Sequence, residues 1–195
     1  MNVTLSLRKF SYDKRQCLIR RGCYMEEKNI LDPHRMFKQA CAFSDCARCC
    51  EIEANNIIEY RFNSHTVSGI VNSAFSCEVF IKTLLVIHGV SVNKMIGKKA
   101  CDGHDLKKLW KLFKEKDSET ASLVELKMQE IFNSNNKNMF DELLDNVSNA
   151  FKYWRYIYEK NSGSININFL RFFRLLLREI CCKQLYDKTW AEFIE

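Results

Sequence analysis

The sequence predicts an all-α domain preceded by an N-terminal extension. Its 195 residues include one proline and six glycines, so few residues interrupt helices. Apolar residues recur at i, i+3 and i+4 over several long stretches, which is the spacing of amphipathic helices. Hydrophobic residues make up 47% of the chain and charged residues 28%, a composition typical of a globular protein. We expect residues 1–31 to form the extension and residues 32–195 to form one domain with a single core.

The net charge of +6 is unevenly distributed. Residues 1–31 hold seven basic residues against three acidic ones, and residues 97–116 again hold seven against three. Such local basicity indicates contact with phosphates or with an acidic partner, or else a solvated helix face and a basic tail. The charge pattern leaves both alternatives open.

The sequence predicts a cytoplasmic protein that makes no contact with a membrane. Charged residues from Arg8 onward come too early for a signal peptide, and no uncharged apolar run approaches the ~18 to 20 residues that span a bilayer. The ten cysteines are therefore expected to be reduced thiols.

Asp32-Pro33 predicts the start of the first helix, because Asp is a favourable N-cap and Pro is tolerated at the first helical position. This helix is expected over residues 33–60. It contains Cys41, Cys46, Cys49 and Cys50.

The C-x-x-C spacing of Cys46 and Cys49 raises the alternative of a zinc site. A second half-site is missing, since Cys181 and Cys182 are adjacent in the sequence. Cys46, Cys49 and Cys50 share one helical face, so we expect them to pack in the core and expect no metal.

A second helix is predicted from Ser64 to His88, with Gly89 as its C-terminal cap. Glu78 and Lys82 lie within its apolar stretch in the i, i+4 order that favours an ion pair. Buried charges need partners, so the two residues either form a structural ion pair or belong to a ligand site.

Residues 89–102 are expected to form a loop that ends in Gly103-His104-Asp105-Leu106. Asp102 is the expected N-cap of a third helix, with His104 in its first turn and Asp105 reaching back as in a capping box. Lysines follow on the outer face of this helix. His104 is a capping or packing residue in one interpretation, and part of an anion site at the helix N-terminus in the other.

Three further helices follow. One begins at Asp117 or Ser118 and ends near Phe132, and the next covers residues 137–160 with Tyr158 facing inward. The last begins near Asn166. Arg155 and Glu159 are spaced for an i, i+4 ion pair.

Three segments resemble the HEPN superfamily of helical domains: residues 73–85 around Glu78 and Lys82, residues 103–109 beginning with the GHDL sequence, and residues 151–159 around Arg155. The resemblance covers about residues 33–185. It implies an up-and-down helical bundle that often forms a homodimer.

HEPN domains include metal-independent ribonucleases, which carry an Arg followed after four to six residues by His, and members without this motif that bind nucleotides or RNA or act as interaction modules. No histidine follows Arg155 at this spacing, and Arg61…His65 is one residue too short. The resemblance therefore implies a non-catalytic binding module of a defence or toxin–antitoxin type system, with a partner protein encoded nearby. No cofactor and no catalytic residue are predicted.

The residues expected to form the binding site are Glu78, Lys82, His104, Asp105, Arg155 and Tyr158. The expected ligand is RNA or a nucleotide, since the planar fork of Arg suits a phosphate. One alternative is a ribonuclease-like effector with His104 as its general acid or base. A structural dimerisation module is the other.

Overall fold

A computed structural model describes residues 31–56, 64–96, 103–159 and 163–195 of the chain. The regular structure in these ranges is helical throughout, as predicted. The chain divides after Ile30, and the helices belong to the unit Leu31–Glu195, which begins one residue before the expected boundary at residue 32.

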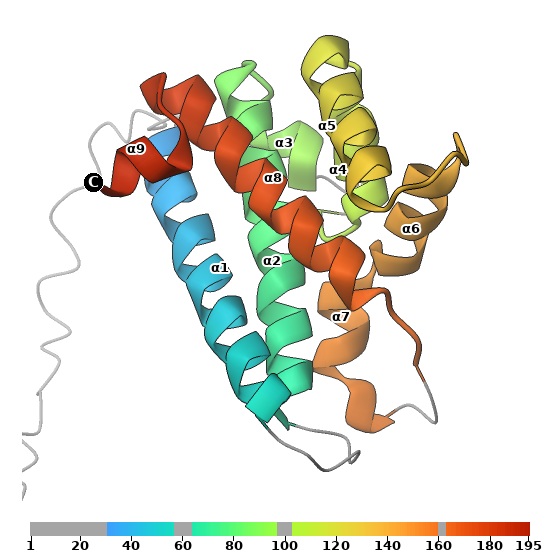
Figure 1. The fold of residues 1–195 in the computed structure, drawn as a ribbon. Helices are drawn as coiled ribbons and strands as arrows, with labels where there is room; N and C mark the ends of the chain where they lie inside the picture. Colours follow the sequence, from blue (N-terminus) through green and yellow to red (C-terminus); the bar gives the residue numbers. More distant parts are fainter. Residues whose placement is uncertain (1–30, 57–63, 97–102, 160–162) are drawn as a thin grey trace, which may run out of the picture. The chain divides into compact units, whose positions relative to one another are not determined.

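Two long antiparallel helices, α1 (Pro33–Asn56) and α2 (Ser64–Ile87), run side by side (Figure 1). The Asp32 carboxylate accepts a hydrogen bond from the backbone N–H of His34 at 2.9 Å, which confirms the predicted start of α1. Gly89 has a φ of 73°, and the N–H of Val90 donates to the carbonyl of Leu85 at 2.9 Å. This Schellman motif ends α2 where the glycine predicted it. Residues 57–60, the expected end of the first helix, lie outside the described residues.

The expected loop over residues 89–102 contains a short helix, α3 (Val92–Ile96), and the next helix, α4 (Leu106–Lys114), begins later than expected. Its N-cap is Asp105, whose backbone is extended and whose carboxylate accepts the N–H of Lys108 at 3.0 Å. His104 therefore precedes the helix and does not lie in its first turn. Asp102, the expected cap, is outside the described residues.

The helix expected over residues 137–160 is divided into α6 (Met139–Val147), α7 (Ala150–Arg155) and a 3-10 helix, η2 (Ile157–Glu159). The first break falls at Ser148, whose carbonyl accepts the N–H of Leu106 at 3.0 Å. In a continuous helix that carbonyl would accept from residue 152. Tyr158 is 77% exposed, so the expectation that it faces inward was wrong.

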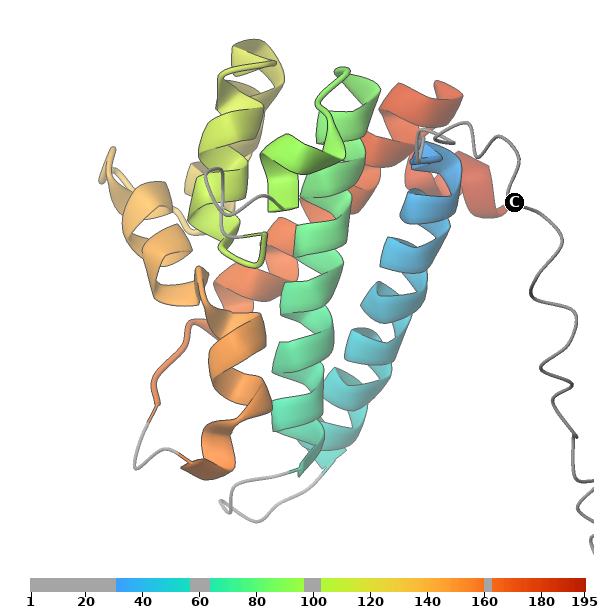
Figure 2. The ribbon, with the colours of Figure 1, turned by 180° about the vertical axis from the view of Figure 1, so that it is seen from behind.

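The remaining helices are α5 (Ser118–Ile131), α8 (Ile167–Tyr186) and α9 (Trp190–Ile194). Asp117 caps α5 and Asn166 caps α8, as predicted, whereas α9 was not expected. Helix α8 crosses in front of α2 in Figure 1, and the reverse view places it behind α2 (Figure 2).

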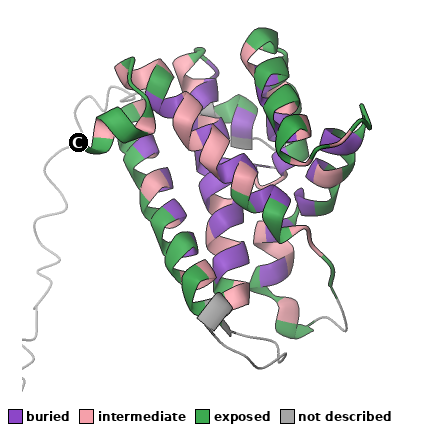
Figure 3. Cartoon of the chain, viewed as in Figure 1, coloured by how far each residue is buried: buried purple, intermediate pink, exposed green. Residues whose placement is uncertain are grey.

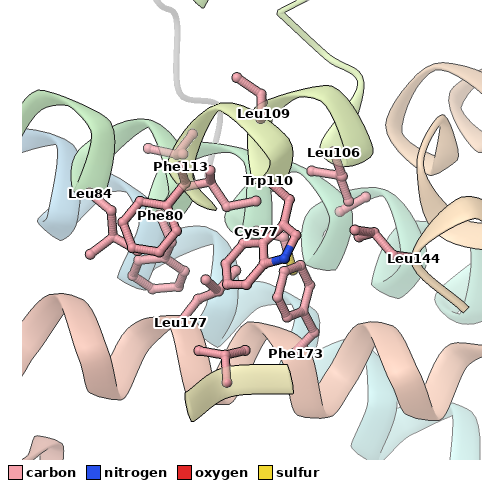
Figure 4. Close-up of a cluster of buried hydrophobic side chains, with 14 of the residues drawn as sticks. Cys77, Phe80, Leu84, Leu106, Leu109, Trp110, Phe113, Leu144, Phe173 and Leu177 are labelled. Atoms are coloured by element: carbon pink, nitrogen blue, oxygen red, sulfur yellow. The ribbon is translucent and has the colours of Figure 1, made fainter. Parts of the chain in front are cut away.

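The core surrounds α2, which packs against α1, α4, α7 and α8. Buried residues follow α2 along most of its length (Figure 3). Around it, Phe80 of α2, Trp110 of α4 and Phe173 of α8 belong to one apolar cluster, in which the rings of Trp110 and Phe173 lie 5.3 Å apart (Figure 4). Full burial of one such side chain stabilises the fold by roughly 1.5–3 kcal/mol.

Helix α2 is also long and apolar enough, over His65–Ile87, to cross a membrane by length and composition alone. The expectation of no such segment concerned uncharged runs, and Glu78 and Lys82 interrupt this one. Most of its span is buried inside the bundle, as in the core helix of a soluble protein, so it is weak evidence for a membrane.

Candidate functional site

The carboxylate of Glu78 is the centre of the predicted polar cluster. Its side chain is 2% exposed, and each of its oxygens has a partner. Lys82, one turn later on α2, donates to Oε1 at 2.7 Å, and Nδ1 of His104 lies 2.9 Å from Oε2. Glu78 and Lys82 therefore form the ion pair that their spacing favours, and the GHDL turn before α4 meets the same carboxylate.

His104 links this buried carboxylate to the surface, because its side chain is 45% exposed. An ionised Glu78 accepts a hydrogen bond from a protonated Nδ1, which leaves Nε2 of a neutral imidazole as a lone-pair acceptor. A carboxylate that fixes the tautomer of a partly exposed histidine is also the arrangement found in general-base sites. The geometry therefore permits proton transfer at His104 but supplies no second catalytic group by itself.

Asp105 and Ser148 occupy the N-terminus of α4. The Ser148 hydroxyl donates to Asp105 at 2.6 Å and accepts the N–H of Lys107 at 3.2 Å, while the Ser148 carbonyl accepts the N–H of Leu106. Desolvation acts to raise the pKa of Asp105, but the hydrogen bonds from Ser148 and Lys108 outweigh it and lower the pKa. Because these first-turn N–H groups have partners within the fold, this helix end is not an open anion site.

The structure places Arg155 and Tyr158 outside the Glu78 cluster. Arg155 is exposed at the end of α7, with its guanidinium carbon 4.9 Å from the ring centroid of Phe151 and 4.7 Å from that of Tyr156. Among the described ion pairs there is none between Arg155 and Glu159, so the expected i, i+4 pair is corrected to a cation–π contact.

The ring of Phe151 lies between the Glu78 cluster and Arg155. Its ring centroid is 5.3 Å from that of His104 and 4.9 Å from that of Phe75, with which it stacks. Arg155 contacts the same ring. The Glu78–His104 pair thus helps to fix the helix that presents Arg155 and, after it, the two tyrosines of residues 156–158.

A second polar cluster, which sequence reasoning missed, joins α1, α2 and α8. Arg174 of α8 is buried, and its Nη1 and Nη2 lie 2.9 and 3.1 Å from the two carboxylate oxygens of Glu51. Nη1 also donates to the hydroxyl of Ser73 at 3.0 Å. The available signal was the position of Arg174, because it lies in the apolar stripe between Leu170 and Leu177.

Next to this cluster is a cavity of about 240 Å³ lined by α1, α2 and α8. Its lining includes Glu51, His65, Ser73 and Arg171. Nε of Arg171 is 3.6 Å from Glu51, so two arginines contact one carboxylate.

The described ranges have no net charge. They hold nineteen of the 30 basic residues and nineteen of the 24 acidic residues, so the remaining residues carry the +6. The outer face of α4, which the sequence predicts as basic, is partly neutralised, because Lys107 pairs with Asp145 and Lys114 pairs with Glu125, each at 2.8 Å. The net positive charge of the chain therefore lies outside the described helices.

The cysteines of α1 do not pack as expected. Cys46 and Cys49 are exposed and Cys50 is partly buried, whereas Cys77, Cys181 and Cys182 are buried. Within the described ranges no group of three or more His, Cys, Asp or Glu side chains is placed to hold a metal ion.

Comparison of the chain with protein-family models, with curated proteins and with solved structures gave no match.

Proposed function

We propose that the chain is a non-catalytic, HEPN-like helical module that binds single-stranded RNA or a nucleotide through Arg155, Tyr156 and Tyr158. The proposal includes an up-and-down bundle of HEPN type and a role in a defence or toxin–antitoxin type system, both of which depend on the resemblance of the three sequence segments. The observation that carries the binding function is an exposed aromatic pair beside an arginine.

Tyr156 and Tyr158 are 40% and 77% exposed, and their ring centroids lie 6.3 Å apart. The Arg155 guanidinium lies over the Tyr156 ring. Single-stranded nucleic acids bind to such surfaces because each base can stack on an aromatic ring or on the plane of a guanidinium. Arg155 can in addition donate two hydrogen bonds to a phosphate.

Neutrality of the described ranges supports stacking as the main contribution. A protein that binds through many lysine–phosphate contacts loses affinity steeply with salt, whereas stacking on aromatic rings is less sensitive to salt. We expect a shallow salt dependence for the three-residue surface, with any steeper component coming from the basic residues of 1–31.

Fluorescence anisotropy with a labelled single-stranded RNA decamer, at two salt concentrations and with AMP as competitor, tests the proposal. Replacement of Tyr158 by Ala should weaken binding roughly 5- to 150-fold, the equivalent of about 1–3 kcal/mol per stacked base. Ile194→Ala removes another exposed apolar side chain and is the matched control. Undetectable binding by the wild type, or equal binding by the Tyr158 variant, would refute the proposal.

Arg155→Gln provides a second variant, with Arg35→Gln as its exposed control. Both should remain folded. Because Arg155 contacts rings at the surface and has no buried partner, its loss should cost less than about 1 kcal/mol of unfolding free energy. An ion pair between Arg155 and Glu159 would have implied a larger loss of unfolding free energy.

The Glu78–His104 geometry favours a second candidate, a ribonuclease-like effector in which Nε2 of His104 accepts a proton from a 2′-hydroxyl. Incubation of total RNA with wild type, His104→Ala and His88→Ala distinguishes the candidates. Intact RNA with the wild type excludes the ribonuclease. Cleavage that only the His104 variant loses would replace the non-catalytic proposal.

The third candidate is a dimerisation module, which the exposed apolar side chains of α5 favour. Leu123, Leu126 and Ile131 are all exposed on this helix. If they form a homodimer interface, Leu126→Glu should convert a dimer to a monomer in light scattering after size exclusion. A wild-type monomer at high concentration would exclude this candidate.

A further inference from the structure

The cavity at the junction of α1, α2 and α8 has the composition of a ligand site. Its volume of about 240 Å³ is below the roughly 300–1,000 Å³ of sites for drug-sized molecules, so it suits a small molecule. One side is polar, with Glu51, His65 and Arg171, and another is apolar, with Ile70, Ile167 and Leu170. Ligand sites commonly combine an apolar wall with a few polar groups.

The sign of the local charge favours an anionic ligand. Arg174 neutralises Glu51 from the buried side through two hydrogen bonds. Arg171 then adds a second positive charge beside the same carboxylate. The three groups together carry a formal charge of +1, and Arg171 is 48% exposed, so its guanidinium is accessible to a ligand.

Two helix ends reinforce this preference. His65 and Thr66 belong to the first turn of α2, and Ile167 and Asn168 to the first turn of α8, and all four line the cavity. Amides in a first turn have no acceptor within their own helix, and the N-terminal end of a helix carries a partial positive charge. In α8 the Asn166 side chain already accepts the N–H of Phe169, so the amides of Ile167 and Asn168 are the ones that a ligand would use there. The two helices have 24 and 20 residues.

A buried donor near the cavity is also unsatisfied. Nε of Arg174 is buried and has no hydrogen-bond partner among the described residues. The same side chain is bonded to Glu51 and Ser73, which line the cavity. Arg174 is not itself among the residues that line the cavity, so this donor belongs to the buried support of the cavity wall and is not a contact to the ligand.

We propose that this cavity binds the phosphate monoester of a small phosphorylated molecule. Arg171 and the first turns of α2 and α8 hold the phosphate, and the apolar wall contacts the carbon skeleton. The two-pronged guanidinium matches phosphate geometry, and the small volume restricts the carbon part to about the size of a sugar. This site is separate from the Arg155–Tyr158 surface.

Isothermal titration of the full chain with ribose 5-phosphate, ribose and inorganic phosphate tests the proposal. We expect ribose 5-phosphate to bind more tightly than inorganic phosphate, and ribose not to bind. Arg171→Gln should weaken the binding of ribose 5-phosphate about tenfold or more, because it removes a charge-assisted hydrogen bond. Arg35→Gln, at an exposed arginine of α1, should leave it unchanged.

A titration with a 5′-phosphorylated and an unphosphorylated RNA decamer separates a free metabolite from an RNA end as the source of the phosphate. Tighter binding of the phosphorylated decamer that Arg171→Gln abolishes assigns the site to RNA ends, and equal binding of both assigns it to free metabolites. No heat of binding for any phosphate, or the same affinity in both arginine variants, would overturn the proposal. Tyr158→Ala should leave ribose 5-phosphate binding intact, so failure here is distinguishable from failure of the proposed RNA surface.

Discussion

Arg174 and Glu51 lie 123 residues apart in the sequence and form a two-pronged ion pair, with Nη1 and Nη2 of the buried guanidinium 2.9 and 3.1 Å from the two carboxylate oxygens. The pair connects α8 to α1, and Ser73 connects the same arginine to α2. It therefore fixes the three helices that surround the cavity.

Removal of one partner should destabilise the fold strongly. Glu51→Ala leaves the Arg174 charge buried, and we expect the free energy of unfolding to fall by about 3 kcal/mol in urea denaturation. Replacing both residues with Leu should cost less than this single change, because no buried charge then remains. A Glu51→Ala variant as stable as the wild type would show that water solvates the guanidinium.

Substitutions of Glu78 and of His104 should destabilise the fold by different amounts. We expect Glu78→Ala to cost about 3 kcal/mol, since it leaves Lys82 poorly solvated, and His104→Ala to cost about 1 kcal/mol, because the imidazole is half-exposed. Glu130→Ala, at an exposed position of α5, is the control and should change stability by less than about 0.5 kcal/mol. Thermal and urea unfolding give these values. Equal losses for Glu78 and His104 would contradict the picture of one buried anchor.

Acid should weaken the cap of α4. Hydrogen bonds from Ser148 and Lys108 lower the pKa of Asp105 below its usual value of 3.8 in spite of desolvation. A carboxylate with a lowered pKa stabilises the folded state above its unfolded pKa, and this contribution is lost as the pH falls through the folded pKa.

The corresponding measurement compares unfolding free energies at pH 7 and pH 3 for wild type and Asp105→Asn. Asn retains a capping oxygen but does not titrate, so the variant should lose less stability than the wild type between the two pH values. Identical losses would show that Asp105 does not contribute to acid sensitivity.

Thiol reactivity should separate the exposed Cys46 and Cys49 of α1 from the buried cysteines of the core. Cys46 and Cys49 are exposed and should react first with iodoacetamide, as followed residue by residue by mass spectrometry. Burial raises the pKa of the Cys77 thiol to about 12 and that of Cys181 well above its usual value, so both should react only on unfolding. Cys46→Ser with Cys49→Ser removes the fast phase at these positions. Early modification of Cys77 in folded protein would mean that the core opens locally.

The sequence predicted those helix ends whose signals are local. Asp32, Asp117 and Asn166 accept hydrogen bonds from amides two or three residues later, and Gly89 takes the positive φ that ends α2. Each signal depends on neighbouring residues only, so it is visible in the chain itself.

The sequence-based helix predictions failed where contacts with a distant segment of the chain determine the local structure. Ser148 interrupts an otherwise regular helical pattern because its carbonyl and hydroxyl accept hydrogen bonds from N–H groups at the N-terminus of α4. Helices α3 and α9 have five residues each, too few to show a period. Periodicity cannot report either effect.

The candidate sites divide in the same way. Glu78 and Lys82 are one turn apart, so their pairing could be predicted, and the GHDL segment indicated His104. Glu51 and Arg174 come together only through the topology of the bundle, and no spacing rule connects them. The sequence predicts Arg155 and Tyr158 as binding residues, and their exposure at the end of α7 and in η2 follows from the division of the expected helix, which no local signal showed.

Because α2 lies at the centre of the bundle, its core is complete only after segments much later in the chain have been synthesised. Three residues of α2 form hydrogen bonds with α8: Ser73 with Arg174, Cys77 with Leu170, and Phe80 with Cys181. Each partner lies about a hundred residues later in the chain. A ribosome therefore releases α1 and α2 long before the helix that completes their core has been made. Until α8 has been synthesised, Glu51 lacks its ion-pair partner Arg174 and the apolar faces of α2 remain exposed to solvent. A chain stalled before residue 167 should therefore be a substrate for chaperones and proteases.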